Sequence, residues 1–231
     1  MNLLAIDTSS KSSVIGLQIK GVRLENITRS EKSHSRDILP NISDLLEQAG
    51  VSLEELDAIV FCQGPGSFTG VRITVGVVQG LGFGLQIPVV PVSSLAILAQ
   101  GEYRRSGATN IMVALTARKE EVYFGAYEVK GELPELLGKE AVLEASRVPR
   151  QKPGSWVGVG DGWCLQDQLE AASGVSVDNI ILDVLPQPQD LLDIGIMEME
   201  RGGGIEALLA RPEYLREQVA DVPAAKSNPT S

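Results

Sequence analysis

The first part of the chain alternates apolar runs with turn residues. Apolar segments at 3–6, 14–19 and 23–28 are separated by short polar turns, which predicts three strands joined as antiparallel hairpins. Between Ser35 and Ala49 the apolar residues recur at helical spacing, and Gly50 follows as a stop signal. The pattern therefore predicts an antiparallel start followed by an amphipathic helix.

A continuous apolar run at 57–62 indicates a strand buried on both faces. It leads into the glycine-rich segment 64–70, and a second helical pattern follows. A strand at 87–92 and a helix at 93–100 come next, before a polar break at 102–109. The order strand, glycine loop, helix is typical of folds that bind an anion at a helix N-terminus.

After this break the same alternation starts again. Strands are predicted at 111–115, 122–129, 141–143 and 156–159, and helices at 163–172 and 188–201. Both halves thus begin with strands and end with helices. We predict an α/β fold of two lobes, residues 1–104 and 105–221, with a frayed tail at 222–231. The last helix of the second lobe is a candidate to pack back on the first lobe.

Composition narrows the classes of function. Of the 231 residues, 43% are hydrophobic and only 4% are aromatic, so we expect a globular protein with an aliphatic core and exclude a disordered chain. The formal net charge of −10 opposes contact with a phosphate backbone. We therefore expect no direct binding to nucleic acid.

Cysteine and histidine usage indicates the compartment and limits the metal chemistry. Cys62 and Cys164 lie far apart in the chain, and no basic leader precedes the first apolar segment, so a reduced, cytoplasmic protein is predicted. The uncharged stretch 73–101 is interrupted by glycines and prolines, and we interpret it as a buried helix and strand rather than a membrane span. A single histidine, His34, provides neither a metal-binding pair nor a convincing catalytic base, so no metal site and no catalytic residue are predicted.

The turn after the first strand is the first candidate site. Asp7, Thr8 and Ser9 combine a carboxylate with two hydroxyls, which can hold a hydrated metal ion and phosphate oxygens. The same hydroxyls can instead only satisfy backbone groups of the turn.

The glycine loops are the second candidate. Gly64, Gly66 and Arg72 place backbone N–H groups, a helix dipole and a guanidinium near one point, where an anion could bind. The alternative is a tight turn that caps the helix. Gly160 and Gly162 form a further loop after a predicted strand, and the combination suggests a nucleotide cleft.

Four segments together carry a family resemblance. They are LLAIDTSS at the N-terminus, residues 56–95 with the sequence GPGSFTGVR, GDGW at 160–163 and RPEYLREQVA at 211–220. These segments closely resemble the TsaB family, also called YeaZ, over nearly the whole chain. That family has the fold of actin, hexokinase and the Hsp70 ATPase domain, which agrees with the duplicated pattern of strands and helices. It is needed to make threonylcarbamoyladenosine next to the anticodon of tRNAs.

The resemblance implies a supporting role. In the family, the paralogous subunit TsaD binds the metal and transfers the threonylcarbamoyl group, and the small ATPase TsaE joins the pair. A non-catalytic partner of TsaD and TsaE, able to form a homodimer when alone, is therefore expected. It would have no cofactor of its own and would bind ATP or ADP weakly or only in the complex. The alternative is an independent ATP-dependent small-molecule enzyme of the same superfamily, which would use Asp7 for a metal ion.

One position departs from the family pattern. Thr116 stands where family members usually have an aspartate, although Arg118 matches. The change removes a carboxylate that is expected to face the cleft, and it weakens the case for a nucleotide or metal there.

The resemblance also implies an interface, because the family pairs through its first two long helices. Here these helices carry apolar residues at helical spacing, and exposed apolar stripes mark contact surfaces. We predict the interface at Ile38, Leu39, Ile42, Leu45, Leu46, Val71, Val75 and Val78. The alternative is that both helices only cover their own sheet.

Overall fold

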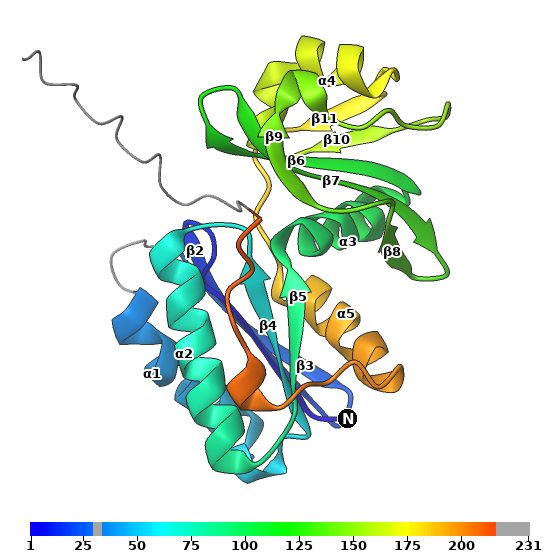
Figure 1. Ribbon diagram of the computed structural model, residues 1–231. Helices are drawn as coiled ribbons and strands as arrows, with labels where there is room; N and C mark the ends of the chain where they lie inside the picture. Colours follow the sequence, from blue (N-terminus) through cyan, green and yellow to red (C-terminus); the bar gives the residue numbers. More distant parts are fainter. Residues whose placement is uncertain (30–33, 216–231) are drawn as a thin grey trace, which may run out of the picture.

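Two mixed β-sheets lie one above the other and form two lobes (Figure 1). The structure is a computed structural model, and it describes residues 1–29 and 34–215. The predicted tail at 222–231 lies outside the described residues.

The first sheet has the strand order β3-β2-β1-β4-β5. Strands β1 to β3 form antiparallel pairs, whereas β4 and β5 run parallel to β1. The antiparallel start follows from the short polar turns between the first three apolar segments. The bounds are β1 Leu3–Asp7, β2 Ser12–Ile19, β3 Val22–Arg29, β4 Ala58–Gly64 and β5 Val89–Ser93.

The second sheet repeats this arrangement in the order β11-β10-β6-β7-β8, with β9 also paired to β7. Again three strands form antiparallel pairs and two further strands run parallel to the first. The bounds are β6 Asn110–Arg118, β7 Glu121–Lys130, β8 Leu133–Leu136, β9 Ala141–Glu144, β10 Val157–Val159 and β11 Asn179–Ile181. The two lobes therefore share one topology.

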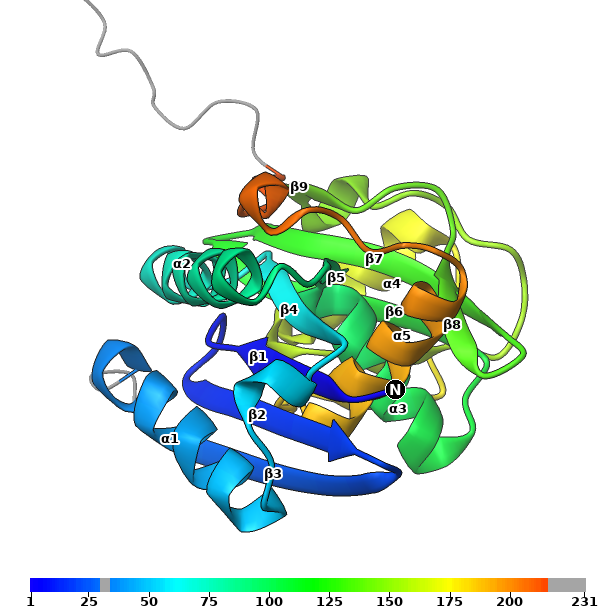
Figure 2. The ribbon, with the colours of Figure 1, turned by 90° about the horizontal axis from the view of Figure 1, so that it is seen from below.

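Helices cover both faces of the first sheet. Figure 2 shows α1 (His34–Ala49) and α2 (Phe68–Leu85) on one side and α5 (Pro188–Glu200) on the other. The helix α3 (Ser94–Ser106) begins directly after β5 and lies between the two sheets, and α4 (Gln166–Ser173) packs on the second lobe.

The lobes exchange their last helices. Leu95, Leu98 and Ala99 of α3 are buried with residues of β6 and β7, whereas Leu191 and Leu192 of α5 are buried with residues of β1, β4 and β5. The chain thus crosses between the lobes twice, once at α3 and once at residues 182–187. Because a helix of each lobe packs on the sheet of the other, the exchange holds the two sheets next to each other.

The polar segment 102–109 was predicted as a break, and that prediction is wrong at its start. The helix α3 continues to Ser106 because its polar residues have partners: Arg104 donates to Asp190, and Arg105 donates to Glu102. Gly107, in the left-handed region at φ 75°, ends the helix.

The helix α2 has the length and mean hydropathy (1.3) of a membrane-crossing segment. In the structure one face of this helix is buried on the first sheet, through Val71, Thr74, Val75 and Val78. Its apolar character therefore serves packing within the lobe.

Candidate functional site

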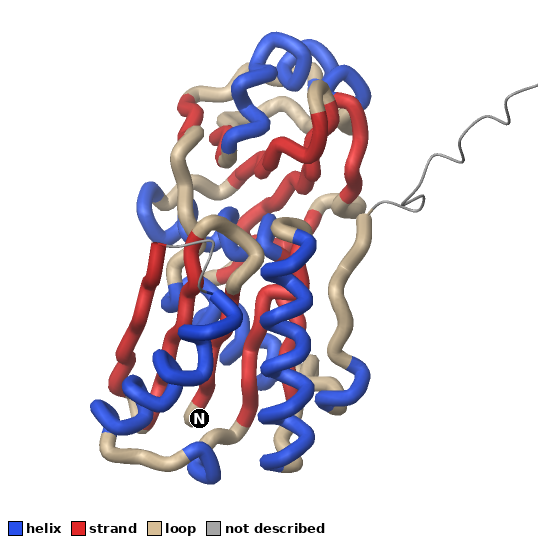
Figure 3. The backbone as a smooth tube through the Cα atoms, turned by 90° about the vertical axis from the view of Figure 1, so that its left-hand side faces the viewer, coloured by secondary structure: helices blue, strands red, loops and turns tan. Residues whose placement is uncertain are grey.

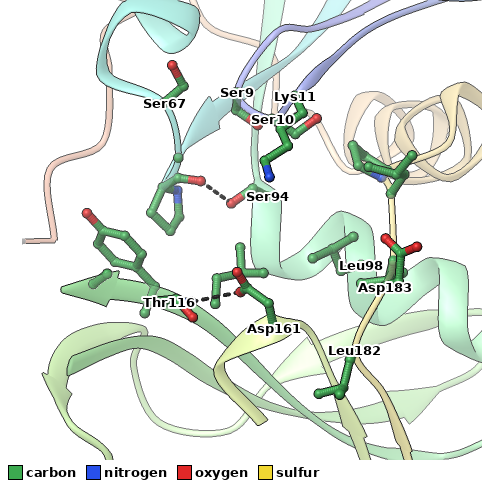
Figure 4. Close-up of a pocket in the computed structure, with 18 residues that line it drawn as sticks. Ser9, Ser10, Lys11, Ser67, Ser94, Leu98, Thr116, Asp161, Leu182 and Asp183 are labelled. Atoms are coloured by element: carbon green, nitrogen blue, oxygen red, sulfur yellow. Dashed lines mark hydrogen bonds between the residues drawn. The ribbon is translucent and has the colours of Figure 1, made fainter. Parts of the chain in front are cut away.

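A cleft of about 480 Å³ opens between the two lobes (Figure 4). Every wall comes from the end of an element. The first lobe contributes the β1–β2 turn, the β4–α2 loop and the start of α3, and the second contributes the end of β6, residue Asp161 and the crossing segment. The lining side chains drawn with labels are Ser9, Ser10, Lys11, Ser67, Ser94, Leu98, Thr116, Asp161, Leu182 and Asp183.

Asp7 and Thr8 belong to the interior rather than to the cleft wall. Asp7 is 1% exposed, and its Oδ1 accepts the backbone N–H of Ser9 at 2.6 Å. The Thr8 hydroxyl donates to the carbonyl of Gly70 at 2.7 Å, and its backbone N–H donates to the hydroxyl of Thr74. Of the three predicted residues, only Ser9 lines the cleft. For Thr8, the alternative that its hydroxyl satisfies backbone groups is the one that the hydrogen bonds support.

The first glycine loop is shaped by close backbone approach. A Cβ on Gly66 would lie 2.4 Å from the carbonyl oxygen of Ser9, and the N–H of Ser67 donates to that same oxygen at 2.7 Å. The Ser67 hydroxyl accepts from the N–H of Gly70, which makes Ser67 the N-cap of α2. Gly64 has a φ of 104° and does not line the cleft. The capping alternative is therefore present in the loop, while Gly66 and Ser67 still face the cleft.

The second glycine loop packs on the end of β6. A Cβ on Gly160 would lie 2.3 Å from the carbonyl oxygen of Ala114, and one on Gly162 would lie 2.9 Å from it. These glycines let the 3₁₀ helix η3 (Asp161–Leu165) approach the strand. Asp161 between them accepts the backbone N–H of Thr116 at 2.8 Å and lines the cleft.

Charged groups of the cleft were missed by the sequence reasoning. Lys11 comes from the β1–β2 turn, and the carboxylates of Asp161 and Asp183 come from the second lobe and the crossing segment. Asp161 had a signal, since it stands inside the second glycine loop. Asp183 had none, because only the fold brings residues 182–186 to the cleft. Although Thr116 replaces the usual aspartate, a carboxylate is thus still present beside it.

Cys62 lies beneath the β1–β2 turn and is fully buried. Its thiol donates to the hydroxyl of Ser9 at 3.3 Å. Burial first, and then the charge of Asp7, raise the pKa of the Cys62 thiol well above its usual value. The thiol is therefore an inert interior group.

Arg72 does not reach the cleft. Its guanidinium stacks on the ring of Phe68, 3.3 Å from the ring centre, and lies 5.3 Å from the centre of the Tyr214 ring. It lines a neighbouring cavity of about 280 Å³ that continues from Pro65 and Gly66 toward residues 213–215. Gly66 and Arg72 of the predicted anion site therefore line one cavity beside the cleft, whereas Gly64 lines neither the cleft nor this cavity.

The predicted interface residues do not form an exposed stripe. Seven of them are between 0% and 7% exposed and pack against β1, β2 and β4 in the core of the first lobe, namely Ile38, Ile42, Leu45, Leu46, Val71, Val75 and Val78. Only Leu39, at 53%, is exposed. The expectation of exposure was wrong because periodicity marks the buried face of a helix before any other face.

The exposed side of α2, called its outer face below, instead carries three glycines beside Phe83, which is 56% exposed. Gly76, Gly80 and Gly84 are exposed, and a Cβ added to any of them would meet no atom of the described part of the chain within 4 Å. The residues after α5 run alongside the helix, where Gln79 donates to the carbonyl of Ala210 at 2.8 Å (Figure 3). Another backbone could approach this face closely.

Two sheets of one topology, with exchanged helices and a cleft between them, define the two-lobed class of actin, hexokinase and the Hsp70 ATPase domain. This confirms the predicted fold class. A family model described as TsaD, tRNA N6-adenosine threonylcarbamoyltransferase, matches residues 24–157.

Full-length relatives specify the family. The chain is 36% identical over 227 residues to the tRNA threonylcarbamoyladenosine biosynthesis protein TsaB of Escherichia coli, covering 95% of this chain and 96% of that protein. It is 32% identical to TsaB of Haemophilus influenzae, with 95% of each chain covered. The solved structure of YeaZ from Pseudomonas aeruginosa matches with a TM-score of 0.86 and 42% identity, over 93% of this chain and 99% of that one. The chain belongs to the TsaB (YeaZ) family.

Proposed function

We propose that this chain is a non-catalytic assembly subunit that binds a TsaD transferase and, with the ATPase TsaE, supports threonylcarbamoyladenosine formation on tRNA. Family membership supports a role of this chain in that pathway, since the relatives are named for threonylcarbamoyladenosine biosynthesis. The observation that best supports a binding role is the outer face of α2, with its exposed glycines. The net charge of −10 on this chain is consistent with a complex in which the partner subunits, and not this chain, hold the tRNA.

The glycine face of α2 fits a partner helix for a geometric reason. Gly76 and Gly80 have no Cβ, and no atom of residues 1–29 and 34–215 would lie within 4 Å of one, so a second helix can approach at short axial distance. Glycine in the middle of a helix lowers its stability by about 1 kcal/mol relative to alanine. Three exposed glycines in α2 are therefore unfavourable for the free chain and consistent with a contact made in a complex, or in a homodimer when no partner is present.

The cleft supports a binding role for nucleotide rather than a reaction. Its hydroxyls Ser9 and Ser67 and the ammonium of Lys11 fit phosphate oxygens, so ATP or ADP in the assembled complex is compatible with the lining. Among the described residues no group of three or more histidine, cysteine and carboxylate side chains could hold a metal ion. Asp7, on which an independent ATP-dependent enzyme would depend, is 1% exposed. The alternative of such an enzyme gains no support.

The test is association with TsaD from the same organism. Light scattering of the two purified proteins, apart and mixed, should give a one-to-one complex. Gly76→Gln should abolish it without unfolding the free chain, because the added side chain projects from an open surface.

Gly154→Gln is the matched control. Gly154 is also exposed. A Cβ added there would lie 3.8 Å from the nearest side-chain atom, Nε1 of Trp156, which is an ordinary contact distance. This variant should bind TsaD like the wild type. No complex between the wild-type proteins, with or without ATP, would contradict the proposed function.

A further inference from the structure

The cavity beside the cleft has walls from three distant parts of the chain. Phe68 and Arg72 come from the first two turns of α2, Arg118 from the end of β6, and Glu213 and Tyr214 from the segment that follows α5. We call this cavity of about 280 Å³ the arginine notch. It joins both lobes, since α2 belongs to the first and β6 to the second.

Arg72 is held in place before any partner arrives. Its guanidinium carbon lies over the Phe68 ring, 3.3 Å from the ring centre, and its Nη1 donates to the carbonyl of Phe68 at 3.3 Å. The centre of the Tyr214 ring, which also lines the notch, lies 5.3 Å from the guanidinium carbon of Arg72. A stacked guanidinium keeps its remaining N–H groups in a fixed plane, which is the geometry that binds a carboxylate with two hydrogen bonds.

The notch carries an excess of positive charge. Within residues 1–29 and 34–215, neither Arg72 nor Arg118 forms an ion pair. Glu213 also lines the notch, yet within these same residues its carboxylate forms no ion pair with either guanidinium. Among the described residues, two arginines and one glutamate thus line this small cavity, in a chain whose net charge is −10.

The surroundings indicate a protein ligand. Phe68 and Tyr214 are 63% and 49% exposed, so their rings offer apolar surface beyond the notch itself. Exposed aromatic residues around arginine are typical of the energetically dominant centre of a protein interface. In addition, Arg72 precedes Gly76 by one helical turn, so the notch continues the outer face of α2.

We propose that the subunit covering the outer face of α2 inserts an aspartate or glutamate side chain, next to an apolar residue, into the arginine notch. Its carboxylate binds Arg72 of the first lobe and Arg118 of the second at once. The partner thereby fixes the angle between the lobes as well as its own position. This inference rests on the proposed function, because it uses the same partner.

The first experiment measures the Kd for TsaD by calorimetry with Arg72→Gln, Arg118→Gln and the double variant. Each single change should raise the Kd roughly ten- to a hundredfold, as the loss of a buried charged hydrogen bond does. The Kd of the double variant should rise by less than the product of the two single-variant factors, because both residues bind one carboxylate. Arg147→Gln is the control: Arg147 is an exposed arginine of the second lobe and should leave the Kd unchanged.

A second experiment identifies the inserted residue. A photo-crosslinking benzoylphenylalanine at position 68 should attach to a TsaD peptide that contains an aspartate or glutamate. Changing that acid to arginine should weaken binding to the wild-type chain and restore binding to the Arg72→Glu variant. Arg118→Gln provides a separate test should Arg72 variants alter folding, which thermal melting reports.

Three outcomes would overturn the inference. An unchanged Kd for the double variant, with wild-type binding intact, would remove the notch from the interface and leave the proposed function standing. An Arg72-dependent binding of ATP or of a tRNA anticodon stem-loop, with TsaD affinity unchanged, would assign the notch to a nucleotide or RNA instead. Failure of the wild-type chain to bind TsaD would contradict the proposed function and this inference together.

Discussion

The backbone of Gly70 lies directly against Thr8, so that a Cβ on Gly70 would stand 1.8 Å from the carbonyl oxygen of Thr8. The Thr8 hydroxyl completes the contact by donating to the carbonyl of Gly70 at 2.7 Å. This contact joins the β1–β2 turn to the first turn of α2. It therefore fixes the start of α2 against the turn whose next residues, Ser9 and Ser10, line the cleft.

The first prediction follows from this contact. Gly70→Ala should destabilise the protein by at least about 2 kcal/mol, because the methyl group overlaps backbone atoms that cannot move separately. Gly76→Ala, on the open face of the same helix, should be neutral or stabilising by up to about 1 kcal/mol. Urea unfolding of both variants measures the difference. Equal stabilities would show that the turn and the helix are not in contact.

The second prediction concerns the bond between Asp161 and Thr116. Asp161→Ala removes the acceptor of the Thr116 N–H and should cost about 0.5–1.5 kcal/mol, the usual value for one such hydrogen bond. Asp183→Ala, which removes a carboxylate from the same cleft without a hydrogen bond of that kind, should cost less than about 0.5 kcal/mol. Thermal melting of the two variants distinguishes them, and the reverse order would contradict the assigned role of Asp161.

The third prediction uses the ion pair that joins α3 to α5. Arg104 donates to Asp190 at 2.6 Å, and the Asp190 side chain is 1% exposed. Arg104→Met should cost about 1–3 kcal/mol at pH 7, because it leaves a buried carboxylate without its partner. Arg147→Met, which breaks an exposed pair with Glu144, should cost less than about 1 kcal/mol.

The cost of Arg104→Met should depend on pH. Burial raises the pKa of Asp190 even beside Arg104, and without the arginine the carboxyl protonates more readily in the folded state. The variant should therefore be nearest to the wild type at low pH and lose stability as the pH rises through the raised pKa. A constant difference between pH 4 and 7 would contradict this account.

The fourth prediction concerns Glu140, which accepts a hydrogen bond from the buried Tyr127 hydroxyl. Burial raises the pKa of Glu140 above its usual value, although the hydrogen bonds from Ser93 and Tyr127 act in the opposite direction. Its stabilising contribution is thus complete below the unfolded pKa and is lost as the pH rises through the folded pKa.

Glu140→Gln removes this titration and keeps an acceptor for Tyr127. The stability of the variant relative to the wild type should increase between pH 4.5 and 7, by about 1.4 kcal/mol for each pH unit of the pKa shift. Urea midpoints across this range report the change. Parallel pH profiles for the two proteins would contradict it.

Local patterns predicted most of the fold. The hairpins of the first lobe and the helices α1 and α2 follow from periodicity and from turn residues, and the duplication was visible as a repeated order of elements. The short strands β8 and β11 were missed, although β9 and β10 of the same length were predicted. In β8, Pro134 argues against a strand, because proline donates no hydrogen bond to a sheet. The end of α3 was missed because the partner of Arg104 is Asp190, which lies far away in the sequence.

The site was predicted less well than the fold. Glycine loops were located correctly, but in Gly66, Gly160 and Gly162 the lack of a side chain first serves backbone packing. Asp7 is polar and lies two residues before Ser9, which lines the cleft, yet Asp7 itself is buried beneath the turn. Whether a residue faces inward or outward depends on its neighbours in space, which periodicity does not specify. The interface itself stays a prediction.

The most direct test of the central claim is threonylcarbamoyladenosine formation in a reconstituted system of TsaD, TsaE, their remaining partners and tRNA. We expect no product when this chain is omitted, full product with Gly154→Gln, and a loss of at least tenfold with Gly76→Gln although that variant is folded. Full product without the chain, or with Gly76→Gln at limiting concentration, would contradict the account of a subunit that acts by docking through the outer face of α2.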